Sequence, residues 1–468
     1  MAEFPFQLIV EADQPEKKAE TVSCTSLLRT IEGKRETYEG VWGGQAVIVK
    51  VFFSRRPFKK DWSGLATLQK LGLNSPKPLF SGRTEDGKWV TAAEKIADSS
   101  TVLEIFNQTE DKTKKTALML LVLMEVAKQH DKGVLQKDLH LGNFMLSGAK
   151  VFAIDPAEIR FLGQPLSREQ SISQLALLAS YFPLENLTSI AELGKSYFAA
   201  RGWVFEDADR DLLLKQIKLC KTKWTKKTLK KSLRTGKKYQ QIKINNHVAV
   251  FDRNFCQSTN AEDFIKQIDA LMDKGAVLKK GNSCYVSAVT WNNQRVVIKR
   301  YNHLGLIHSL RHTIKGSRAR QGWLYGHRLR LLNIATPKPV AYIEHRRNLL
   351  IWDCYLVTEY VEGQKLYDFL KSSSISTGEK MTVIQKVVEL LEKLSKNFIT
   401  HGDLKHTNIL LSDNGPVLTD LDGMKVHKFK WMWRHRQTKD IKRFEKAACN
   451  YNDVADIVKV FTKRLAKS

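Results

Sequence analysis

Paired cysteines, long apolar runs and acidic residues are scarce in this sequence. Its six cysteines are scattered, no two stand at the CxxC spacing of a metal site, and they are too few for a disulfide framework. The longest apolar run, at 117–124, is far too short to cross a bilayer, and segment 1–18 lacks the pattern of a secretory signal. These absences exclude a disulfide scaffold and a membrane-spanning protein, and they favour a reducing, cytoplasmic setting.

The size and the charge of the chain set the next limits. With 468 residues, of which 43% are hydrophobic, the chain exceeds one ordinary core and suits two globular domains. Lys and Arg number 76 against 49 Asp and Glu, a formal net charge of +27. Such an excess bears on partners, so nucleic acid, an anionic membrane and phosphorylated ligands are the candidates.

A polar motif occurs twice. Residues 401–411 read HGDLKHTNILL, and residues 136–146 read QKDLHLGNFML. Three polar residues of the first copy reappear in the second at one constant offset of 265 positions, which favours a duplicated domain over chance. The pairs are Asp138 and Asp403, Asn143 and Asn408, and Asp155 and Asp420.

The repeat extends upstream of the motif. Residues 46–53 and 295–302 are β-branched runs that predict strands, and each carries one lysine near its end, Lys50 or Lys299. A PKP turn recurs at 76–78 and 337–339, and an apolar helical stripe precedes each motif, most clearly at 383–398. Each copy therefore reads as strands, a helix, more strands, helices and a polar loop, an α+β order.

These residue types suit phosphoryl transfer, which depends mainly on positioning and charge neutralisation. Asp138 and Asp403 are the candidate bases that orient an attacking hydroxyl. The remaining candidates are metal-holding side chains and phosphate-neutralising lysines. They are Asn143 and Asp155 or Asn408 and Asp420 for Mg²⁺, and Lys50 or Lys299 for the phosphates.

The D-L-x-x-x-N motif with a strand-borne Asp and an upstream Lys strand resembles the protein-kinase-like superfamily. More narrowly, both halves resemble the lipopolysaccharide kinase family of Gram-negative bacteria, which includes InaA-type proteins and the kinases of core heptose or Kdo. The residues that carry this resemblance are at 318–341, 356–363, 401–411 and 439–446. The resemblance implies two tandem bilobal kinase-like domains, 1–235 and 236–468, each with an antiparallel β-sheet N-lobe and a mainly helical C-lobe.

The resemblance also implies ATP, Mg²⁺ and phosphate transfer to a sugar hydroxyl, with Glu359 at the hinge that reads adenine. The second copy keeps the usual His401 before its catalytic Asp, and its Lys405 is placed to touch the transferring phosphate. The first copy has Gln136 and His140 at those positions. We therefore expect activity in the second domain, and leave the first as active, active on another acceptor, or a degenerate partner that binds substrate.

Nucleotide positioning is the least defined part of the pattern. Neither copy has a clear Gly-rich loop. Asp61 is the candidate acid to pair with the strand lysine of the first copy, but the aligned residue of the second is Gly322.

Basic residues gather in the second half. Segment 425–443 interleaves Phe429, Trp431 and Trp433 with many cations, and 311–320 adds further charge. Aromatic and basic residues together suit an anionic membrane or lipopolysaccharide better than nucleic acid, since no nucleic-acid motif accompanies them.

The leading hypothesis is thus an ATP-dependent kinase of lipopolysaccharide core sugars or their precursors, peripheral at the cytoplasmic face of the inner membrane. A protein serine/threonine kinase and a non-catalytic pseudokinase scaffold remain as alternatives.

Overall fold

The protein divides into two compact units, residues 1–222 and 223–468. The computed structural model describes residues 3–12, 19–181, 187–256, 258–303, 305, 310, 313, 316–347, 350–448, 458–460 and 462–463. Helix α6 (Asp207–Lys231) contains the division between the units, whereas the predicted domain boundary is at residue 235. No helix within these described ranges is long and apolar enough to cross a membrane.

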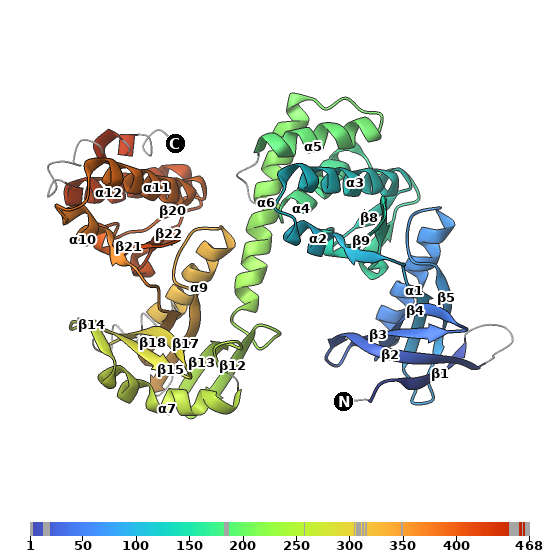
Figure 1. The fold of residues 1–468 in the computed structure, drawn as a ribbon, viewed down its shortest axis with the longest axis horizontal. Helices are drawn as coiled ribbons and strands as arrows, with labels where there is room; N and C mark the ends of the chain where they lie inside the picture. The colour runs from blue at the N-terminus through green and yellow to red at the C-terminus, as the bar shows by residue number, and fades with distance from the viewer. Residues whose placement is uncertain are drawn as a thin grey trace. The chain divides into compact units, whose positions relative to one another are not determined.

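Unit 1 opens with six antiparallel strands that close into a barrel in the order β1-β2-β3-β4-β6-β5 (Figure 1). Alternate residues of β4 point inwards, so Val47, Val49 and Val51 lie in the barrel core. Lys50 lies between two of them in the sequence and therefore faces outwards, where helix α1 packs. The bounds are β1 (Phe6–Ala12), β2 (Ala19–Ile31), β3 (Arg35–Trp42), β4 (Gln45–Phe52), α1 (Arg55–Lys70), β5 (Pro78–Arg83) and β6 (Trp89–Glu94).

Closure of this barrel depends on one glycine. Strand β1 pairs with β5 through Glu11 opposite Arg83 and Ala12 opposite Gly82. A Cβ atom on Gly82 would overlap the backbone carbonyl oxygen of Glu11. Only a residue without a side chain therefore permits this close approach of the two strands. The sequence predicted an antiparallel sheet here but not its closure.

The rest of unit 1 is mainly helical. Helix α3 begins after Asp111, whose carboxylate accepts hydrogen bonds from the amides of Thr113 and Lys114. Its buried face contributes Met119, Val122 and Val126 to a core shared with the helices that follow. The bounds are β7 (Ser99–Thr101), α2 (Val102–Gln108), α3 (Lys112–Asp131), β8 (Val134–Gln136), η1 (Leu141–Asn143), β9 (Phe144–Ser147), β10 (Lys150–Ala153), η2 (Pro156–Glu158), β11 (Ile159–Phe161), α4 (Arg168–Ala179) and α5 (Leu187–Ala200).

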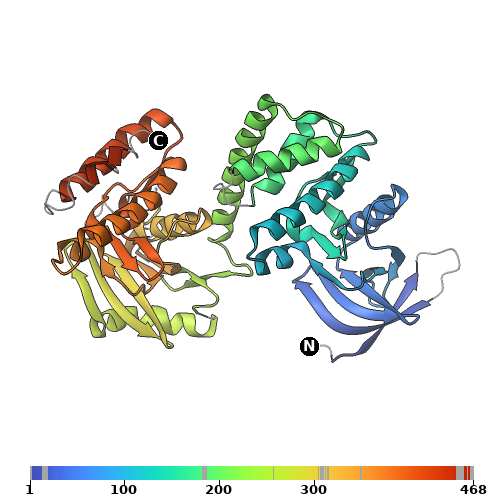
Figure 2. The same ribbon diagram turned by 45° about the horizontal axis from the view of Figure 1, so that its top comes forward.

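Unit 2 opens with a seven-stranded antiparallel sheet in the order β12-β13-β17-β18-β16-β15-β14, with helix α7 on the side away from the helices that follow (Figures 1 and 2). Val296 and Ile298 of β16 share a core with α7. Tyr301, on the opposite face of the strand, packs in a second core with Trp323 of helix α9. By the same alternation Lys299 belongs to the α9 face. The bounds are β12 (Tyr239–Ile244), β13 (His247–Asp252), α7 (Ser258–Lys274), β14 (Ala276–Lys280), β15 (Cys284–Trp291), β16 (Gln294–Tyr301), α9 (Arg318–Leu331), β17 (Pro339–Arg347) and β18 (Leu350–Glu359).

The helical part of unit 2 is built around α11. Ser376 and Glu379 form a capping box at its start, and Ile384, Val387 and Leu391 give it a continuous buried face. The bounds are β19 (Gln364–Lys365), α10 (Leu366–Lys371), α11 (Thr377–Lys396), β20 (Ile399–Thr400), η4 (His406–Asn408), β21 (Ile409–Ser412), β22 (Gly415–Leu418), η5 (Leu421–Gly423), β23 (Lys425–Val426) and α12 (Lys430–Ala448).

The predicted local structure agrees with these elements. The lysine-bearing runs are strands β4 and β16, and the apolar stripes before the polar motifs are helices α3 and α11. Each PKP segment leads into a strand, β5 or β17. The α+β class is confirmed, while the assignment of both units as kinase domains stays a prediction.

Candidate active site

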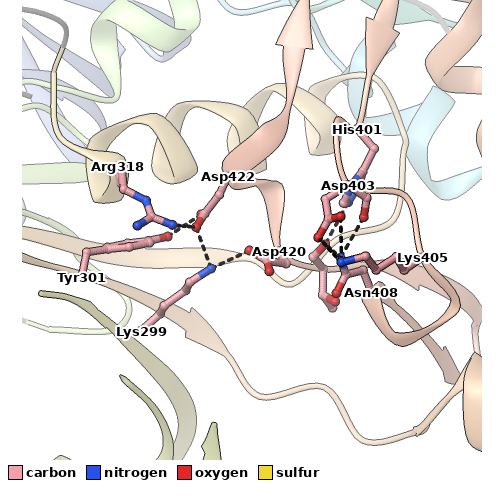
Figure 3. A network of polar contacts seen from close by, with 10 residues as sticks. Lys299, Tyr301, Arg318, His401, Asp403, Lys405, Asn408, Asp420 and Asp422 are labelled. Carbon is pink, nitrogen blue, oxygen red and sulfur yellow. Dashed lines mark hydrogen bonds and ion pairs between the residues drawn. The ribbon is translucent and has the colours of Figure 1, made fainter. Parts of the chain in front are cut away.

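Lys299 connects the sheet of unit 2 to the segment after β22. Its Nζ atom lies 2.5 Å from Asp420 Oδ1 and 2.8 Å from Asp422 Oδ2. Figure 3 shows Asp420 between Lys299 on one side and the group of Asp403, Lys405 and Asn408 on the other. Segments more than a hundred residues apart in the chain therefore bring together the lysine and the carboxylate that the sequence selected.

Asp422 contacts three side chains around Lys299, and the sequence analysis did not select it. Besides Lys299, it accepts hydrogen bonds from the Tyr301 hydroxyl at 2.6 Å and from Arg318 Nη2 at 2.7 Å. Burial alone would raise the pKa of Asp422, but Lys299, Tyr301 and Arg318 lower it overall. Burial likewise opposes the charge of Lys299, and the two aspartates raise its pKa. The lysine and the acid are therefore both charged. The second acid in the sequence DLDG was the only signal for Asp422.

Asp420 has an unusual backbone conformation. Its φ of 54° and ψ of 64° lie in the left-handed region, which few residues other than glycine adopt. The preceding residue, Thr419, donates its amide hydrogen to the carbonyl oxygen of Asn408 at 2.9 Å. This strained turn ends β22 and places the carboxylate beside Lys299 and next to the polar loop.

The loop between β20 and β21 holds Asp403. Lys405 Nζ lies 3.0 Å from Asp403 Oδ1, and Arg443 Nη1 of α12 lies 3.4 Å from the same oxygen. Asn408 donates from Nδ2 to the main-chain oxygen of Asp403 at 2.9 Å. Partial burial would raise the pKa of Asp403, but Lys405, Arg443 and Asn408 lower it. Asp403 is therefore an ionised carboxylate at neutral pH, as a proton acceptor must be.

Helix α12 and the β22 segment brace this loop. Both carboxylate oxygens of Asp440 accept the amide hydrogen of Gly402, at 3.1 and 3.0 Å. Arg443 donates to the carbonyl oxygen of Gly402 at 2.5 Å, and His401 Nε2 lies 3.0 Å from the carbonyl oxygen of Thr419. His401 thus braces the loop. Asp440 is a positioning residue to which the sequence analysis gave no role, although it lies in segment 439–446 that carried the family resemblance.

Gly402 itself is expected to tolerate no side chain. Its φ is 84°, and a Cβ atom would overlap the carbonyl oxygen of Gly423. We expect Gly402→Ala to lower the free energy of unfolding by about 1–3 kcal/mol through backbone strain. Denaturant unfolding of the full chain measures this effect. The matched control is Gly378→Ala in α11, where a Cβ atom would meet nothing within 4 Å. Equal stability of the two variants would contradict the argument.

Glu359 is the remaining residue of unit 2 for which the sequence predicted a role, at the hinge that reads adenine. Glu359 ends β18 opposite Val296 of β16, as a hinge after the sheet requires. Its carboxylate pairs with Lys338 Nζ at 3.1 Å and is about half exposed. The structure therefore places Glu359 in the predicted segment, and its contact with adenine stays a prediction.

Unit 1 pairs its strand lysine differently. Lys50 Nζ lies 2.7 Å from Oδ1 of Asp61 on α1, and Thr91 donates to Asp61 Oδ2 at 3.2 Å. The Asp61 side chain is fully buried. Asp61 was the candidate partner in the sequence analysis. In unit 2 the aligned residue is Gly322, where a Cβ atom would lie 2.6 Å from Leu356 Cδ2. The acids in unit 2 come instead from η5, which supplies Asp422, and from the residue before it, Asp420.

The polar loop of unit 1 repeats the backbone pattern of unit 2. Asn143 donates from Nδ2 to the main-chain oxygen of Asp138 at 2.7 Å, and Ile154 donates its amide hydrogen to the carbonyl oxygen of Asn143 at 3.0 Å. Both bonds lie 265 positions before their counterparts. Asp155 follows Ile154, and its carboxylate makes no hydrogen bond or ion pair within the part of the chain that the structure describes. The structure therefore does not bring Asp155 to Lys50 through a direct contact.

Asp138 has a neighbour without a counterpart in unit 2. The Tyr181 hydroxyl donates to Asp138 Oδ1 at 3.2 Å, and His140 Nε2 lies 3.6 Å from Asp138 Oδ2. Burial and the charge of Asp138 raise the pKa of Tyr181 to about 12. Gln136 is buried and donates to Gln129 Oε1 at 2.6 Å, so it takes over a bracing role at the position of His401.

The donor atoms in unit 2 suit a hard cation, although no group of three or more His, Cys, Asp or Glu side chains forms a metal cluster among the described residues. Asn408 uses its amide nitrogen towards Asp403, which leaves its amide oxygen for a ligand. Asp420 supplies carboxylate oxygens at the same place. Oxygen donors of this kind, few in number, are typical of Mg²⁺ held partly by substrate phosphates.

Comparisons with known proteins agree with this chemistry. Residues 276–461 match the family model described as the lipopolysaccharide kinase (Kdo/WaaP) family. Among curated proteins, the chain is 36% identical over 70 residues to the serine/threonine-protein kinase max-2 of Caenorhabditis elegans, covering 15% of this chain and 11% of that protein. It is 30% identical over 95 residues to Aurora kinase C of Mus musculus, covering 19% of this chain and 34% of that protein. The chain thus spans only a small part of these relatives.

Solved structures give two further similarities. WaaP in complex with acyl carrier protein matches with a TM-score of 0.33 and 18% identity, over 42% of this chain and 88% of that one. The PknI kinase domain of Mycobacterium tuberculosis matches with a TM-score of 0.30 and 14% identity, over 42% and 95%. The family resemblance predicted from the sequence is confirmed for the region of the model match. Residues 276–461 of this chain thus match the lipopolysaccharide kinase (Kdo/WaaP) family.

Proposed function

We propose that unit 2 is an ATP-dependent kinase that transfers the γ-phosphate to a sugar hydroxyl of the lipopolysaccharide inner core or its precursor. One observation carries this proposal. Three separated segments bring Lys299, Asp420, Asn408 and Asp403 into one site, inside the region that matches the lipopolysaccharide kinase family.

Each of these side chains has a role that follows from its charge and position. Asp403, ionised and next to solvent, orients the acceptor hydroxyl and accepts its proton as the oxygen attacks phosphorus. Lys299 neutralises the nucleotide phosphates, and Asp422, fixed by Tyr301 and Arg318, keeps that ammonium in place. Lys405 lies beside Asp403, where negative charge develops on the transferring group.

Mg²⁺ would be held by Asn408 and Asp420. When bound, the ion supplies charge neutralisation for the nucleotide phosphates. Lys299 Nζ lies 2.5 Å from Asp420 Oδ1, beside this pair of oxygen donors.

A binding experiment tests the metal site. Mg·ATP at 100 times its dissociation constant is expected to stabilise the wild-type chain by about 2.7 kcal/mol, and Asp420→Asn is expected to remove most of that gain. Thermal unfolding with and without Mg·ATP, and again with EDTA, measures it. Asp413→Asn, an exposed change on the turn after β21, is the control. An unchanged stabilisation in Asp420→Asn would remove Asp420 from the metal site.

Two other functions each have an observation in their favour. The Lys405–Asp403 pair and the short matches to serine/threonine kinases favour a protein kinase. In unit 1, the contact of Tyr181 with Asp138 and the loss of the loop histidine favour a non-catalytic binding partner. Transfer to a generic protein but not to deacylated core sugar would select the first alternative. Absence of any stabilisation by Mg·ATP would select a scaffold.

The proposed location is the cytoplasmic face of the inner membrane, where a lipopolysaccharide precursor would be met. Because the described chain has no helix that spans a bilayer, attachment would be peripheral.

A further inference from the structure

We infer that the start of helix α12 is a docking surface for an anionic lipid bilayer. The α12 patch consists of the exposed apolar side chains and the exposed cations of residues 425–439 and has no counterpart in unit 1. The inference assigns a specific surface to the membrane location given under the proposed function. It rests on that location but does not depend on phosphate transfer. The apolar members are Val426, Phe429, Trp431 and Met432, and the cations are Lys425, Lys428, Lys430, Arg434, Arg436 and Lys439.

Exposure of the aromatic members is the first argument. Trp431 is 71% exposed and Phe429 is 58% exposed. Two large aromatic side chains, separated in the chain only by Lys430 and both open to solvent, are unusual for a surface without a partner. Side chains of this kind are enriched where protein meets the headgroup layer of a membrane.

The fold presents these side chains on a firm support. Trp433, two residues further on, is only 2% exposed and packs edge-on against Phe398, with ring centroids 5.3 Å apart. The sequence analysis counted Trp433 with the interfacial aromatics, and this is wrong because Trp433 anchors α12 in the core. Strand β23 pairs with β20 through Lys425 opposite Thr400, and His427 donates its amide hydrogen to the carbonyl oxygen of Phe398 at 2.9 Å. The α12 patch is thus fixed to the segment that leads into Asp403.

Charge selects the kind of partner. Residues 425–439 contain six Lys and Arg residues and no Asp or Glu. An acidic surface complements such a rim, and the exposed aromatics require an apolar layer beneath that surface. An anionic bilayer offers both, whereas duplex DNA offers the charge but keeps the faces of its bases stacked inside the helix. The second basic segment noted in the sequence, 311–320, lies partly outside the described residues and adds nothing here.

Unit 1 supplies an internal comparison. The corresponding segment carries Phe161, the last residue of β11, and Leu162, both only just over one third exposed. Residues 160–174 contain two arginines and one glutamate in place of the basic run. The fold of unit 1 therefore forms without exposed basic and aromatic residues in this segment. The corresponding residues of unit 2 are thus not explained by the packing of its core.

Vesicle binding of the full chain tests the inference. We expect the protein to float with vesicles of phosphatidylcholine and phosphatidylglycerol, to release in added salt, and not to float with phosphatidylcholine alone. Replacing both Phe429 and Trp431 by Ala is expected to lower the partition coefficient about tenfold or more, because each aromatic side chain loses its burial. Replacing Lys428, Lys430 and Arg434 together by Ala is expected to lower it about a hundredfold, roughly fivefold for each cation.

Controls separate docking from folding and from catalysis. A double change of Phe161 and Leu162 to Ala in unit 1 is expected to leave vesicle binding unchanged. Transfer to a soluble deacylated acceptor is measured in the same samples, and the Phe429 and Trp431 variant is expected to retain it. If the wild-type chain bound anionic vesicles but transferred no phosphate to the soluble acceptor, the proposed function would be overturned and the docking surface would stand. Failure to bind anionic vesicles, equal binding to neutral ones, or binding indifferent to both sets of changes would overturn the docking surface. It would also be overturned if duplex DNA bound in place of vesicles and the same variants lost it.

Discussion

Asp403→Asn is expected to lower the rate of phosphate transfer by about 10²–10⁴-fold, the range for removal of a positioned general base. The amide has nearly the shape of the carboxylate but neither accepts the proton of the acceptor hydroxyl nor carries the charge that Lys405 and Arg443 compensate. Mass spectrometry of a deacylated core acceptor incubated with Mg·ATP measures the added phosphate.

The matched control for Asp403→Asn is Asp138→Asn, the same change at the equivalent position of unit 1. Since Asp138 is contacted by Tyr181 and lacks the loop lysine, we expect the second change to leave transfer nearly intact. Equal transfer by wild type and Asp403→Asn would refute the assignment of unit 2 as the transferring unit. A loss confined to Asp138→Asn would move the active site to unit 1.

Lys50→Met is expected to lower the free energy of unfolding of unit 1 by about 3–5 kcal/mol, because it leaves a buried carboxylate without its counter-charge. The Asp61 side chain is fully buried, and Thr91 donates the hydrogen bond that would remain. Denaturant unfolding of the full chain, followed by a signal from unit 1, measures the loss.

Two further variants isolate the cause. Adding Asp61→Leu to Lys50→Met removes the unpaired charge, so the double variant is expected to recover much of the lost stability. Lys299→Met in unit 2 is expected to cost less, since Asp420 remains partly exposed and Asp422 keeps Tyr301 and Arg318. Similar losses in Lys50→Met and in the double variant would show that packing, and not the buried pair, sets the cost.

Local patterns predicted much of the fold. Alternation in β4 and β16 identified the strands and their lysines, and the helical stripes identified α3 and α11, because these signals depend on neighbours along the chain. The constant offset of 265 positions predicted the two polar loops, whose backbone hydrogen bonds indeed match. The α+β class followed from the order of these elements.

Local patterns did not predict which further residues from distant segments join Lys299 and Asp420. Arg318 meets Asp422 across 104 positions, and Tyr301 meets it across 121. Neither pair has a periodic signature, because tertiary packing alone decides which residues share the site. The bond from Gly402 to Asp440 of α12 was missed for the same reason. The exposure of Trp431 against the burial of Trp433 also depended on how α12 packs, which the interleaved sequence did not reveal.

The two sheets differ in a way that concerns association with other chains. Closure through Gly82 leaves the barrel of strands β1 to β6 in unit 1 without a free edge strand, whereas β12 and β14 are the open edges of the seven-stranded sheet in unit 2. Every residue of β14 is exposed, including Val277 and Leu278. Such a border invites a foreign strand to add itself, and the charges of Lys279 and Lys280 at the end of β14 oppose that addition. In unit 2, Lys279 and Lys280 therefore oppose the edge-to-edge strand pairing that closure through Gly82 prevents in the barrel of unit 1.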